Sequence, residues 1–520
     1  MADFAPEPIE ADVCLVIEGA YPYVTGGVSS WCQDLIQSQC HLTFHLVVIV
    51  APGAELKVRY KLPPNVSGIT NIYAAYLPPG ARSLRGDKKL LDALHGPVSR
   101  VMAQGDAKDL VEIIRLLRPH RDKVGRHLLL DSPEAWRSFC DVYDAMCQGA
   151  SFINAFWGFR TLLGGLYGTI LSELPPARIY HCISTGYAGL FAARAAFETG
   201  RPALVTEHGV YTNERRLEIL AAPWLAVDDS TALAVDGETN KIKEMWINTF
   251  VSYSRACYQA CTYVISLFEG NYALQVEDGA SPDRLCIIPN GIDVEKYSRI
   301  VPGERPETNG KPQLAIGLVG RVVPIKDIKT YVRACALLVK KVPNVVCYIL
   351  GPMDEDPEYA QACQALAAQL GLGERLVFAG MVNLVQWYGK IDVMVLTSIS
   401  EAQPLVILEA GAAGVPSVAT DVGACREIIQ GRSDESPPLG SGGRVAQIGN
   451  PGAVADGIAE LLLNAELRKA CGETMRQRVI RYYDIVSLRL RYAQLYDELL
   501  ALTEPDYATD DKNALLSGVE

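Results

Sequence analysis

The chain has 520 residues, with 48 Lys and Arg against 60 Asp and Glu, so its formal charge is −12. An acidic balance without a basic footprint argues against a dedicated nucleic-acid binder, and we expect no nucleic-acid partner. Hydrophobic residues make up 49% and charged residues 21% of the chain. This composition is that of a folded enzyme and excludes a disordered or collagenous chain. The length suits about three to four domains, or fewer large ones.

The 14 cysteines are scattered singly through apolar segments, and no CxxC pair occurs. This pattern favours free thiols in a reducing compartment over a disulfide framework, a zinc site or a thioredoxin-like redox motif. The N-terminus is acidic and lacks the regions of a signal peptide, and no run of 18 apolar residues is present. We therefore expect a cytoplasmic protein, in which the apolar segment 151–171 is a core helix.

Short apolar runs, each followed by a Gly-rich turn and a helical pattern, predict βαβ units and an α/β fold with parallel sheets. In the first half we expect strands at Val13–Ile17, Leu46–Val50 and Ala203–Thr206. Residues 51–175 carry helical patterns at 108–118 and 134–147. We interpret them as an elaboration of the first half, because no separate sheet pattern is visible.

From Gln313 the alternation becomes regular and predicts one complete α/β unit. The expected elements are strand Leu314–Val319, helix Ile328–Lys341, strand Val345–Leu350, helix Glu358–Leu370, and strands Leu376–Ala379, Val393–Leu396 and Ser417–Thr420. The Pro- and Gly-rich segment Val301–Pro312 is typical of a linker. Residues 476–500 predict a long C-terminal helix with at most a short break, followed by a polar tail over 501–520.

Two α/β halves joined in this way predict domains over 1–300 and 311–475 with a cleft at the carboxyl ends of both sheets. The C-terminal helix is expected to pack back towards the first domain. In that domain, Gly26 and Gly27 lie where a loop meets a helix N-terminus, which can offer free N–H groups to an anion. The pair fits neither GxGxxG nor a Walker A sequence, and a tight turn is the alternative.

Gly320, Arg321 and Lys326 follow the strand Leu314–Val319 directly. Both cationic side chains are expected at the carboxyl edge of the sheet, where a guanidinium fork and an ammonium can neutralise a diphosphate. The alternative is a pair of solvated loop cations.

Glu401 and Glu409 flank a helix start at Pro404, which we place at the first helical position. Glu401 then lies in the preceding loop and Glu409 inside an otherwise apolar helix, where a buried carboxylate needs a partner. Carboxylates accept hydrogen bonds from vicinal hydroxyls of a sugar or ribose. The backbone from Ala402 to Leu405, Pro404 excepted, offers further donors.

His208 ends an apolar strand and is interpreted either as a structural hydrogen-bonding residue or as a residue at the reacting centre. The run Asp354-Glu355-Asp356 matches a DxD metal motif. Its flanking prolines are instead typical of a turn that leads into a helix, where acidic residues suit the helix dipole. No metal site is therefore predicted.

These motifs fall in a recognisable order. Gly26-Gly27, Glu207-His208-Gly209, Pro289-Asn290-Gly291-Ile292-Asp293, Gly320-Arg321, Lys326, Glu401 to Glu409 and Thr420-Asp421-Val422-Gly423 together resemble the family 4 retaining glycosyltransferases. The resemblance implies GT-B architecture, with two Rossmann-like domains facing each other across a cleft. It also implies a UDP-sugar as co-substrate, with no cofactor and no metal.

Carried over to this chain, the resemblance makes Arg321, Lys326 and Gly320 contacts of the diphosphate. Glu401 would contact the donor sugar, Glu409 the ribose, Gly26 and Gly27 the phosphates or acceptor, and His208 the reacting centre. Gln403, Pro404 and Leu405 are expected to bind the co-substrate as well, and Gln403 to help choose the sugar. The sequence departs from the commoner Glu-Gly-Phe/Leu-Pro form at Ala402 and Gln403.

The opening, Leu15 to Trp31, and the run Gly351 to Tyr359 are similar to the PelF-type transferases of Pel exopolysaccharide synthesis. This similarity implies transfer of a hexosyl or N-acetylhexosaminyl unit to a growing polysaccharide, beside an inner-membrane polysaccharide synthase. Two alternatives stay open. One is a UDP-glucose-dependent synthase with a small or storage-glucan acceptor, and the other is a non-catalytic subunit that binds nucleotide-sugar.

Overall fold

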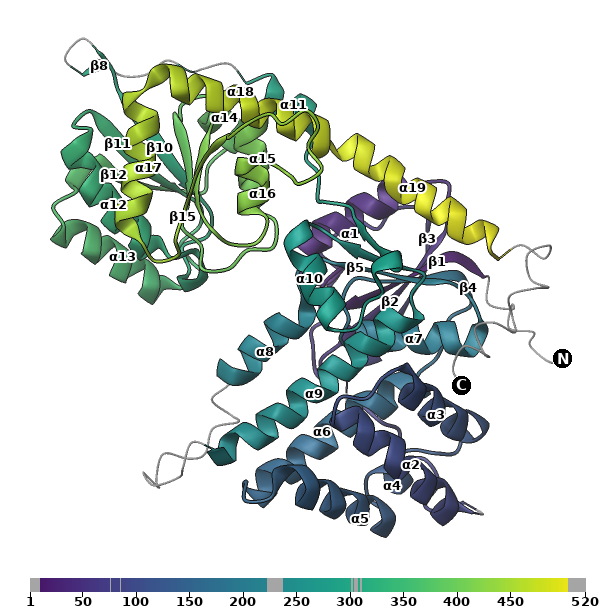
Figure 1. Cartoon of the computed structure of the whole chain (residues 1–520). Coiled ribbons are helices and arrows are strands. Elements are labelled where there is room, and N and C mark those ends of the chain that lie inside the picture. Colours follow the sequence, from purple (N-terminus) through teal and green to yellow (C-terminus); the bar gives the residue numbers. More distant parts are fainter. Residues whose placement is uncertain are drawn as a thin grey trace. The chain divides into compact units, whose positions relative to one another are not determined.

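A computed structural model describes residues 10–74, 76–84, 86–221, 237–300, 303, 307–308 and 311–503. The chain forms two compact units. The first contains residues 1–266, 271–287 and 492–520, and the second contains residues 267–270 and 288–491. Each unit is built on its own parallel sheet (Figure 1).

The first unit has a seven-stranded sheet of order β3-β2-β1-β4-β5-β6-β7, and every strand pair is parallel. The strands are β1 (Ala11–Glu18), β2 (Phe44–Val50), β3 (Val66–Tyr73), β4 (Ala177–Cys182), β5 (Ala203–Glu207), β6 (Tyr263–Ser266) and β7 (Leu285–Ile287). The chain builds outward from β1 to β3 and then returns to place β4 on the other side of β1. The strand order therefore reverses between β1 and β4, the point at which open α/β sheets bind ligands.

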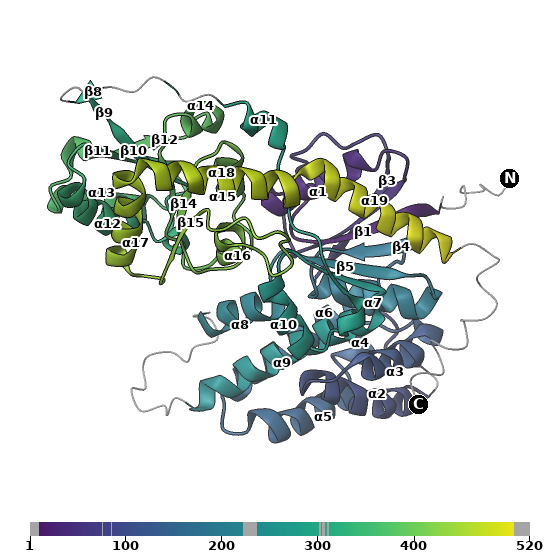
Figure 2. The ribbon, with the colours of Figure 1, turned by 45° about the horizontal axis from the view of Figure 1, so that its top comes forward.

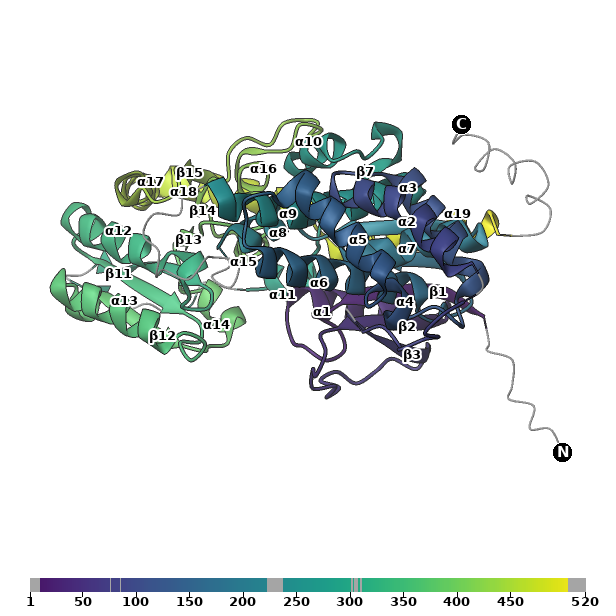
Figure 3. The ribbon, with the colours of Figure 1, turned by 90° about the horizontal axis from the view of Figure 1, so that it is seen from below.

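The helices of the first unit form two groups. The first group comprises α1 (Gly27–Ser38), α7 (Tyr187–Thr199), α8 (Tyr211–Ala221), α9 (Gly237–Ala260) and α10 (Glu269–Glu277); α7 and α9 contact strands of the sheet, and α8 packs against α9. The elaboration consists of α2 (Asp87–Met102), α3 (Ala107–Leu117), α4 (Arg126–Leu129), α5 (Pro133–Val142) and α6 (Phe152–Leu171). Figures 2 and 3 show that α2, α3 and α6 gather against α7 and α9, and α5 packs against α2. One apolar cluster joins them, so the elaboration shares its core with the first unit.

The elaboration differs from our expectation in one respect. Segment 51–175 contributes strand β3 to the edge of the sheet, which the sequence pattern did not reveal. The apolar segment 151–171 is the core helix that we predicted, with twelve buried residues along α6. Over the described residues, no helix is both long enough and apolar enough to cross a membrane.

The second unit has a six-stranded parallel sheet of order β12-β11-β10-β13-β14-β15. The strands are β10 (Leu314–Val319), β11 (Val345–Leu350), β12 (Leu376–Gly380), β13 (Val393–Leu396), β14 (Ser417–Thr420) and β15 (Gly443–Ala446). The helices are α11 (Val294–Ser298), α12 (Ile328–Lys341), α13 (Pro357–Gln369), α14 (Leu384–Tyr388), α15 (Leu405–Ala412), α16 (Cys425–Gln430), α17 (Pro451–Leu463) and α18 (Ala465–Tyr482). Two apolar clusters cover the two faces, one with α12, α13 and α17 and the other with α15, α16 and α18. Here the strand order reverses between β10 and β13.

The expected C-terminal helix is divided at Tyr483 and Asp484 into α18 and α19 (Ile485–Ala501). Helix α19 belongs to the second unit up to Arg491 and to the first unit from Tyr492. In the first unit it contributes the fully buried Tyr496, whose hydroxyl hydrogen-bonds His181 Nδ1 on β4 at 2.7 Å.

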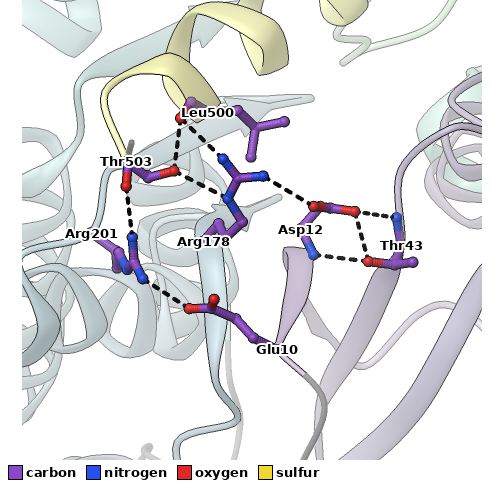
Figure 4. A network of polar contacts seen from close by, with 7 residues as sticks. All are labelled: Glu10, Asp12, Thr43, Arg178, Arg201, Leu500 and Thr503. Atoms are coloured by element: carbon purple, nitrogen blue, oxygen red, sulfur yellow. Dashed lines mark hydrogen bonds and ion pairs between the residues drawn. The ribbon is translucent and has the colours of Figure 1, made fainter. Parts of the chain in front are cut away.

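A polar network fixes the end of α19 within the first unit (Figure 4). Arg178 on β4 donates to the carbonyl of Leu500 at 3.3 Å and to the hydroxyl of Thr503 at 3.1 Å. Its other nitrogen lies 3.5 Å from Asp12, and Arg201 donates to the carbonyl of Thr503. Cations at the last carbonyls satisfy the open end of a helix.

The division between the units falls at Ile287 and Ile288, ahead of the boundary that we expected near residue 300. Ile292 explains the shift, because its amide donates to the carbonyl of Tyr483 and its carbonyl accepts from Ile485. Residues 288–300 are thereby tied to the junction of α18 and α19. Most of the expected linker 301–312, and the expected tail from residue 504, lie outside the described residues.

Candidate active site

The carboxyl edge of the second sheet brings together the charged residues that the sequence singled out. Arg321 and Lys326 follow β10, and Glu401 follows β13, so these three residues flank the point at which the strand order reverses. Glu409 lies on α15, which begins just beyond Glu401. Lys326 and Glu401, more than 70 positions apart in the sequence, meet at this edge because β10 and β13 are parallel and adjacent.

Each cation is paired with a carboxylate. The Arg321 guanidinium donates to both oxygens of Glu355 at 2.5 and 2.6 Å, and both side chains are about half exposed. Lys326 Nζ forms an ion pair with Glu401, which also accepts a 2.6 Å hydrogen bond from the Ser398 hydroxyl. This second pair is more enclosed, with 22% of the Lys326 side chain and 14% of the Glu401 side chain exposed.

Backbone contacts hold the loops that carry this pair. The Thr397 hydroxyl donates to the carbonyls of Lys326 and Asp327, and the amide of Ile399 donates to the carbonyl of Ile325. The Thr420 hydroxyl, at the end of the next strand, donates to the carbonyl of Ser398 at 2.7 Å. The loops after β10, β13 and β14 therefore form one hydrogen-bonded edge, which pre-orients the charged side chains.

Gly423 allows the loop after β14 to approach the Glu401 loop closely. It adopts a left-handed φ of +50°, and an added Cβ would lie 2.2 Å from the carbonyl oxygens of both Glu401 and Ala402. The neighbouring Ala424 amide donates to the Ala402 carbonyl at 2.8 Å. Only glycine fits this position. The sequence indicated Gly423 only as part of the motif Thr420-Asp421-Val422-Gly423.

Glu409 has the partner that a carboxylate on an apolar helix requires. The Tyr388 hydroxyl donates to its Oε2 at 2.7 Å. Burial raises the pKa of Glu409, while the hydroxyls of Tyr388 and Tyr297 and the charge of Lys296 act in the opposite direction. The site therefore holds Glu409 in a partly desolvated, tyrosine-lined position.

Two details of this segment differ from our expectations. Pro404 is the residue that precedes α15, and the helix begins at Leu405, because ψ of Pro404 is extended. The amide of Gln403 is committed to the backbone of Asn290: its oxygen accepts from the Asn290 N–H at 2.7 Å and its nitrogen donates to the Asn290 carbonyl at 3.2 Å. Gln403 is buried, so in this structure it joins two loops of the second unit.

The run Asp354-Glu355-Asp356 has the local role that its flanking prolines predicted. Asp356 caps α13 by accepting a 3.0 Å hydrogen bond from the Tyr359 amide, and Pro357 is the first residue of that helix. Glu355 pairs with Arg321 as described above.

In the first unit, Gly26 precedes α1 and Gly27 begins it. An added Cβ at either glycine would meet no heavy atom within 4 Å, so packing within the chain does not demand glycine there. Gly26 adopts an extended φ that any residue can adopt. Both glycines are exposed, and the Gly26 amide donates to the Tyr60 hydroxyl at 3.4 Å.

His208 follows β5, and its ring meets the Trp31 ring edge to face, with centroids 4.7 Å apart. Its Nε2 is buried without a hydrogen-bond partner. Burial lowers the pKa of His208 to about 4, so the imidazole is neutral at pH 7. Nε2 of His208 can therefore donate or accept a further hydrogen bond at the end of β5.

The sequence did not single out Glu18, which ends β1 at the reversal point of the first sheet. Its Oε2 accepts from the Tyr187 amide at 3.1 Å, at the start of α7, and its Oε1 accepts from the Tyr211 hydroxyl at 3.1 Å. Arg215 lies 3.7 Å from Oε1. Burial raises the pKa of Glu18, against the effects of these partners. The available signal was the position of a carboxylate at the end of the first strand.

Cys182, Cys257 and Cys261 form a buried group, although the sequence contains no CxxC pair. Their sulfur atoms are 3.7 Å apart between Cys182 and Cys257 and 3.8 Å apart between Cys257 and Cys261. All three lie in the apolar cluster beneath the first sheet. Burial raises the pKa of the Cys182 thiol, which favours the neutral form that packs as a small hydrophobic group.

Comparison with known families divides the chain in the same way as its fold. Residues 11–283 match the family described as "Domain of unknown function (DUF3492)". The chain belongs to the DUF3492 family. Residues 304–478, which hold Arg321, Lys326, Glu401 and Glu409, match "Glycosyl transferases group 1". The second unit of this DUF3492 protein therefore matches the group 1 glycosyltransferase model over most of its length.

One relative of this DUF3492 protein is the D-inositol 3-phosphate glycosyltransferase of Nocardia farcinica, which is 36% identical over 163 residues. That match covers 29% of this chain and 36% of the relative. Over the first three relatives, the chain spans 36% to 50% of their length.

Two solved structures share the fold over 94% of the chain. Sucrose-phosphate synthase from Thermosynechococcus elongatus has a TM-score of 0.55 at 16% identity, and 99% of that chain is covered. Anabaena HepE in complex with UDP has a TM-score of 0.54 at 13% identity, and all of that chain is covered. The α/β fold class with two Rossmann-like domains, the GT-B fold, is thereby confirmed.

Proposed function

We propose that this DUF3492 protein is a glycosyltransferase that moves a sugar from a nucleotide-sugar, expected to be a UDP-sugar, to an acceptor hydroxyl. The observation that carries the proposal is the convergence of Arg321, Lys326, Glu401 and Glu409 at the reversal point of the second sheet. These four residues lie within a group 1 glycosyltransferase domain. The complex of HepE with UDP supports UDP as the nucleotide.

Within this proposal the charged residues take distinct roles. Arg321 and Lys326 hold the diphosphate and stabilise the negative charge that develops on it as the bond to the sugar breaks. Glu401 accepts hydrogen bonds from hydroxyls of the sugar, and Glu409 accepts them from the ribose. The diphosphate must compete with Glu355 and Glu401 for the two cations. When the donor binds, the ion pairs of Arg321 and Lys326 with these carboxylates are therefore replaced by contacts with the diphosphate.

The transfer itself follows from the family 4 resemblance. The bond between the anomeric carbon and the diphosphate oxygen breaks, and the acceptor oxygen bonds to the anomeric carbon on the same face. The proton of the acceptor hydroxyl passes to the departing diphosphate, and the anomeric configuration is retained. This front-face path uses no carboxylate nucleophile, and on this proposal no metal ion takes part in it.

The proposal extends to the chemical class of the acceptor. Similarity to PelF-type transferases favours a growing exopolysaccharide, handled in the cytoplasm beside an inner-membrane synthase. The second candidate is a small acceptor, which the activities that name the D-inositol 3-phosphate glycosyltransferase and sucrose-phosphate synthase favour. Analysis of products formed from soluble small acceptors and from oligosaccharides separates these two candidates.

Lys326→Ala tests the proposed role of the second unit. We expect kcat/KM for sugar transfer to fall by about 10²–10³-fold, the usual effect of removing one group that stabilises developing charge. Lys340→Ala is the matched control, since Lys340 is an exposed lysine in the last turn of the helix that follows Lys326. Thermal melting confirms folding of both variants. Wild-type transfer by a folded Lys326→Ala variant would contradict the assignment.

Binding measurements separate an enzyme from a non-catalytic subunit. Ligands that bind only the folded state raise the melting temperature, so UDP-sugars can be compared with GDP- and ADP-sugars directly. Stabilisation by UDP-sugar without any turnover of donor, with oligosaccharide or small acceptors present, would support the non-catalytic alternative.

A further inference from the structure

A hollow in the helical elaboration of the first unit is lined by aromatic rings. It has a volume of about 240 Å³ and lies among the segment before α5, α5 itself and the first half of α6. Its aromatic lining consists of Trp136, Phe139, Phe156 and Phe159. Phe139 and Phe159 are buried, whereas 48% of Trp136 is exposed. One indole is therefore presented to solvent above a packed aromatic base.

Trp136 is held by its neighbours. Its ring centroid lies 5.7 Å from that of Phe139 and 5.8 Å from that of Phe156, with tilted planes. Such contacts restrict the rotamer of an exposed indole, so a ligand that stacks on it pays little conformational entropy.

Polar groups line the same hollow. Arg160 donates to the carbonyl of Leu130 at 2.6 Å and to Asp131 at 2.7 Å, and the side chain of Asp131 is 34% exposed. Ser132 caps α5 by accepting from the Ala135 amide, which leaves its hydroxyl proton to be donated elsewhere. A carboxylate, a guanidinium and a hydroxyl are thus fixed beside an exposed ring.

This combination matches the chemistry of a sugar ring. A pyranose presents one face of C–H groups that stacks on the electron-rich face of an indole, and its hydroxyls require donors and acceptors at the rim. The volume is below the about 300–1,000 Å³ of pockets for drug-sized ligands, which suits a single monosaccharide unit.

We propose that this hollow is a glycan-binding site that holds one sugar unit of an oligosaccharide, with stacking on Trp136 and hydrogen bonds to Asp131, Ser132 and Arg160. The proposal rests on the proposed function, because a transferase that elongates a glycan benefits from a second hold on its acceptor. It assigns a binding role to part of a domain whose family description names none.

A membrane surface is the competing occupant, since Phe152, Ile153 and Trp157 on α6 are also exposed. Binding to anionic lipids, however, relies on an excess of Lys and Arg. Among the described residues around the hollow, Arg126, Arg137 and Arg160 are balanced by Asp131, Glu134 and Asp141, and Arg137 is paired with Glu134 at 2.7 Å. The charge balance and the polar lining favour a neutral hydroxylated ligand.

The test is calorimetric titration of the full chain with chitohexaose, cellohexaose and maltohexaose. We expect at least one hexasaccharide to bind, and Trp136→Ala to raise its Kd about tenfold or more, while Trp136→Phe retains part of the affinity. Trp157→Ala is the matched control: it removes an exposed indole of α6 that does not line the hollow, and it should bind as the wild type does. Circular dichroism checks that each variant is folded.

Three outcomes would overturn the proposal. The first is that none of the three hexasaccharides binds, and the second is that Trp136→Ala binds with wild-type affinity. The third is that Trp136→Ala and Trp157→Ala lose hexasaccharide affinity equally and also lose equally the ability to float with phosphatidylglycerol–phosphatidylethanolamine vesicles. The last would assign the face to a membrane. UDP titration of the same proteins keeps the two proposals separate, because Trp136→Ala should bind UDP as the wild type does. Hexasaccharide binding without UDP binding would count against the proposed function alone.

Discussion

Both carboxylate oxygens of Glu355 accept from one guanidinium nitrogen of Arg321, Nη1, in the position where we propose the diphosphate binds. Removing the charge of Glu355 should free the guanidinium for the ligand. We expect Glu355→Gln to lower the Kd for UDP by up to about fivefold, because exposed ion pairs contribute at most about 1 kcal/mol. Glu358→Gln makes the same charge change at an exposed position of α13 and should leave the Kd unchanged. Calorimetric titration with UDP measures both, and weaker binding by Glu355→Gln would show that Glu355 assists the ligand.

His208 makes stability depend on pH in a defined direction. Its folded-state pKa of about 4 lies below the ordinary value of 6.5, so the unfolded chain binds the proton more readily between these values. This contribution to stability is therefore complete above pH 6.5 and is lost as the pH falls towards 4. Between pH 6.5 and 4, we expect the unfolding free energy of His208→Phe, measured by urea titration, to fall less than that of the wild type. The difference should be about 1.4 kcal/mol for each pKa unit by which folding lowers the pKa of His208.

His41→Asn controls for the general effect of losing a histidine, since His41 is exposed. It should follow the wild-type pH profile. Burial also lowers the pKa of His181, to about 3, so part of the acid sensitivity should persist in His208→Phe. A His208→Phe profile identical to the wild type would show that His208 is protonated equally in both states.

At the level of single residues, sequence reasoning was reliable where a residue ends a predicted strand. Arg321 and Lys326 were placed at a sheet edge by the strand before them, and Glu409 was expected to need a partner. The sequence could not show that Gln403 is bound to Asn290, because the two lie 113 positions apart. Glu18 was missed although it follows the first predicted strand directly, and its partner Tyr211 lies 193 positions away.

At the scale of elements, Gly423 combines a left-handed backbone conformation with the close approach of the loop after β14 to the Glu401 loop. Alanine there would meet the carbonyls of Glu401 and Ala402 as well as strain a left-handed φ. Gly414→Ala is the matched control, because Gly414 also has a positive φ but an added Cβ has open space. We expect Gly414→Ala to cost about 1–2 kcal/mol of unfolding free energy, and Gly423→Ala to cost more and to depress sugar transfer. Urea denaturation and transfer rates measure these effects, and equal values for both variants would exclude a steric role.

The elements of the second unit were predicted well because its strands are short, continuous and apolar. The expected bounds of β10, β11, β13 and β14 are those of the structure. In the first unit β4 was missed, since Arg178 and His181 interrupt its apolar run. Both are accommodated by partners distant in sequence, Arg178 by Leu500 and Thr503 and His181 by Tyr496. Edge strand β3 was missed because Ser67-Gly68 and Thr70-Asn71 interrupt its apolar residues and most of the strand is only half buried.

At the scale of the whole molecule, the distribution of charge qualifies the net value of −12. The two cations of the candidate site are already paired with carboxylates, so the site is not a strongly positive patch in the free protein. Donor binding would then depend on exchange of partners and not on long-range attraction alone. The acidic balance, which argued against nucleic acid, is compatible with this arrangement.

The first unit takes part of its core from the far end of the chain. Tyr492, Tyr496 and Leu499 of α19 are buried, and Arg178 and Arg201 hold the end of that helix. A chain that stops after Arg491 should therefore destabilise the first unit by several kcal/mol, since burying each large apolar side chain contributes about 1.5–3 kcal/mol. The proposed UDP site should keep its affinity, because its residues lie wholly in the second unit.

Hydrogen exchange read by mass spectrometry resolves this prediction along the sequence. Peptides from β4 and β5 should lose protection in the chain that stops after Arg491, whereas peptides from β10 and β13 should retain it. A chain that stops after Thr503 is the matched control: it keeps the contacts of Arg178 and Arg201 and removes only the predicted polar tail, so its exchange should equal that of the full chain. Uniform loss of protection in both sheets would mean that the two units unfold as one cooperative body, and unchanged protection in β4 and β5 would show that α19 contributes little to the first unit.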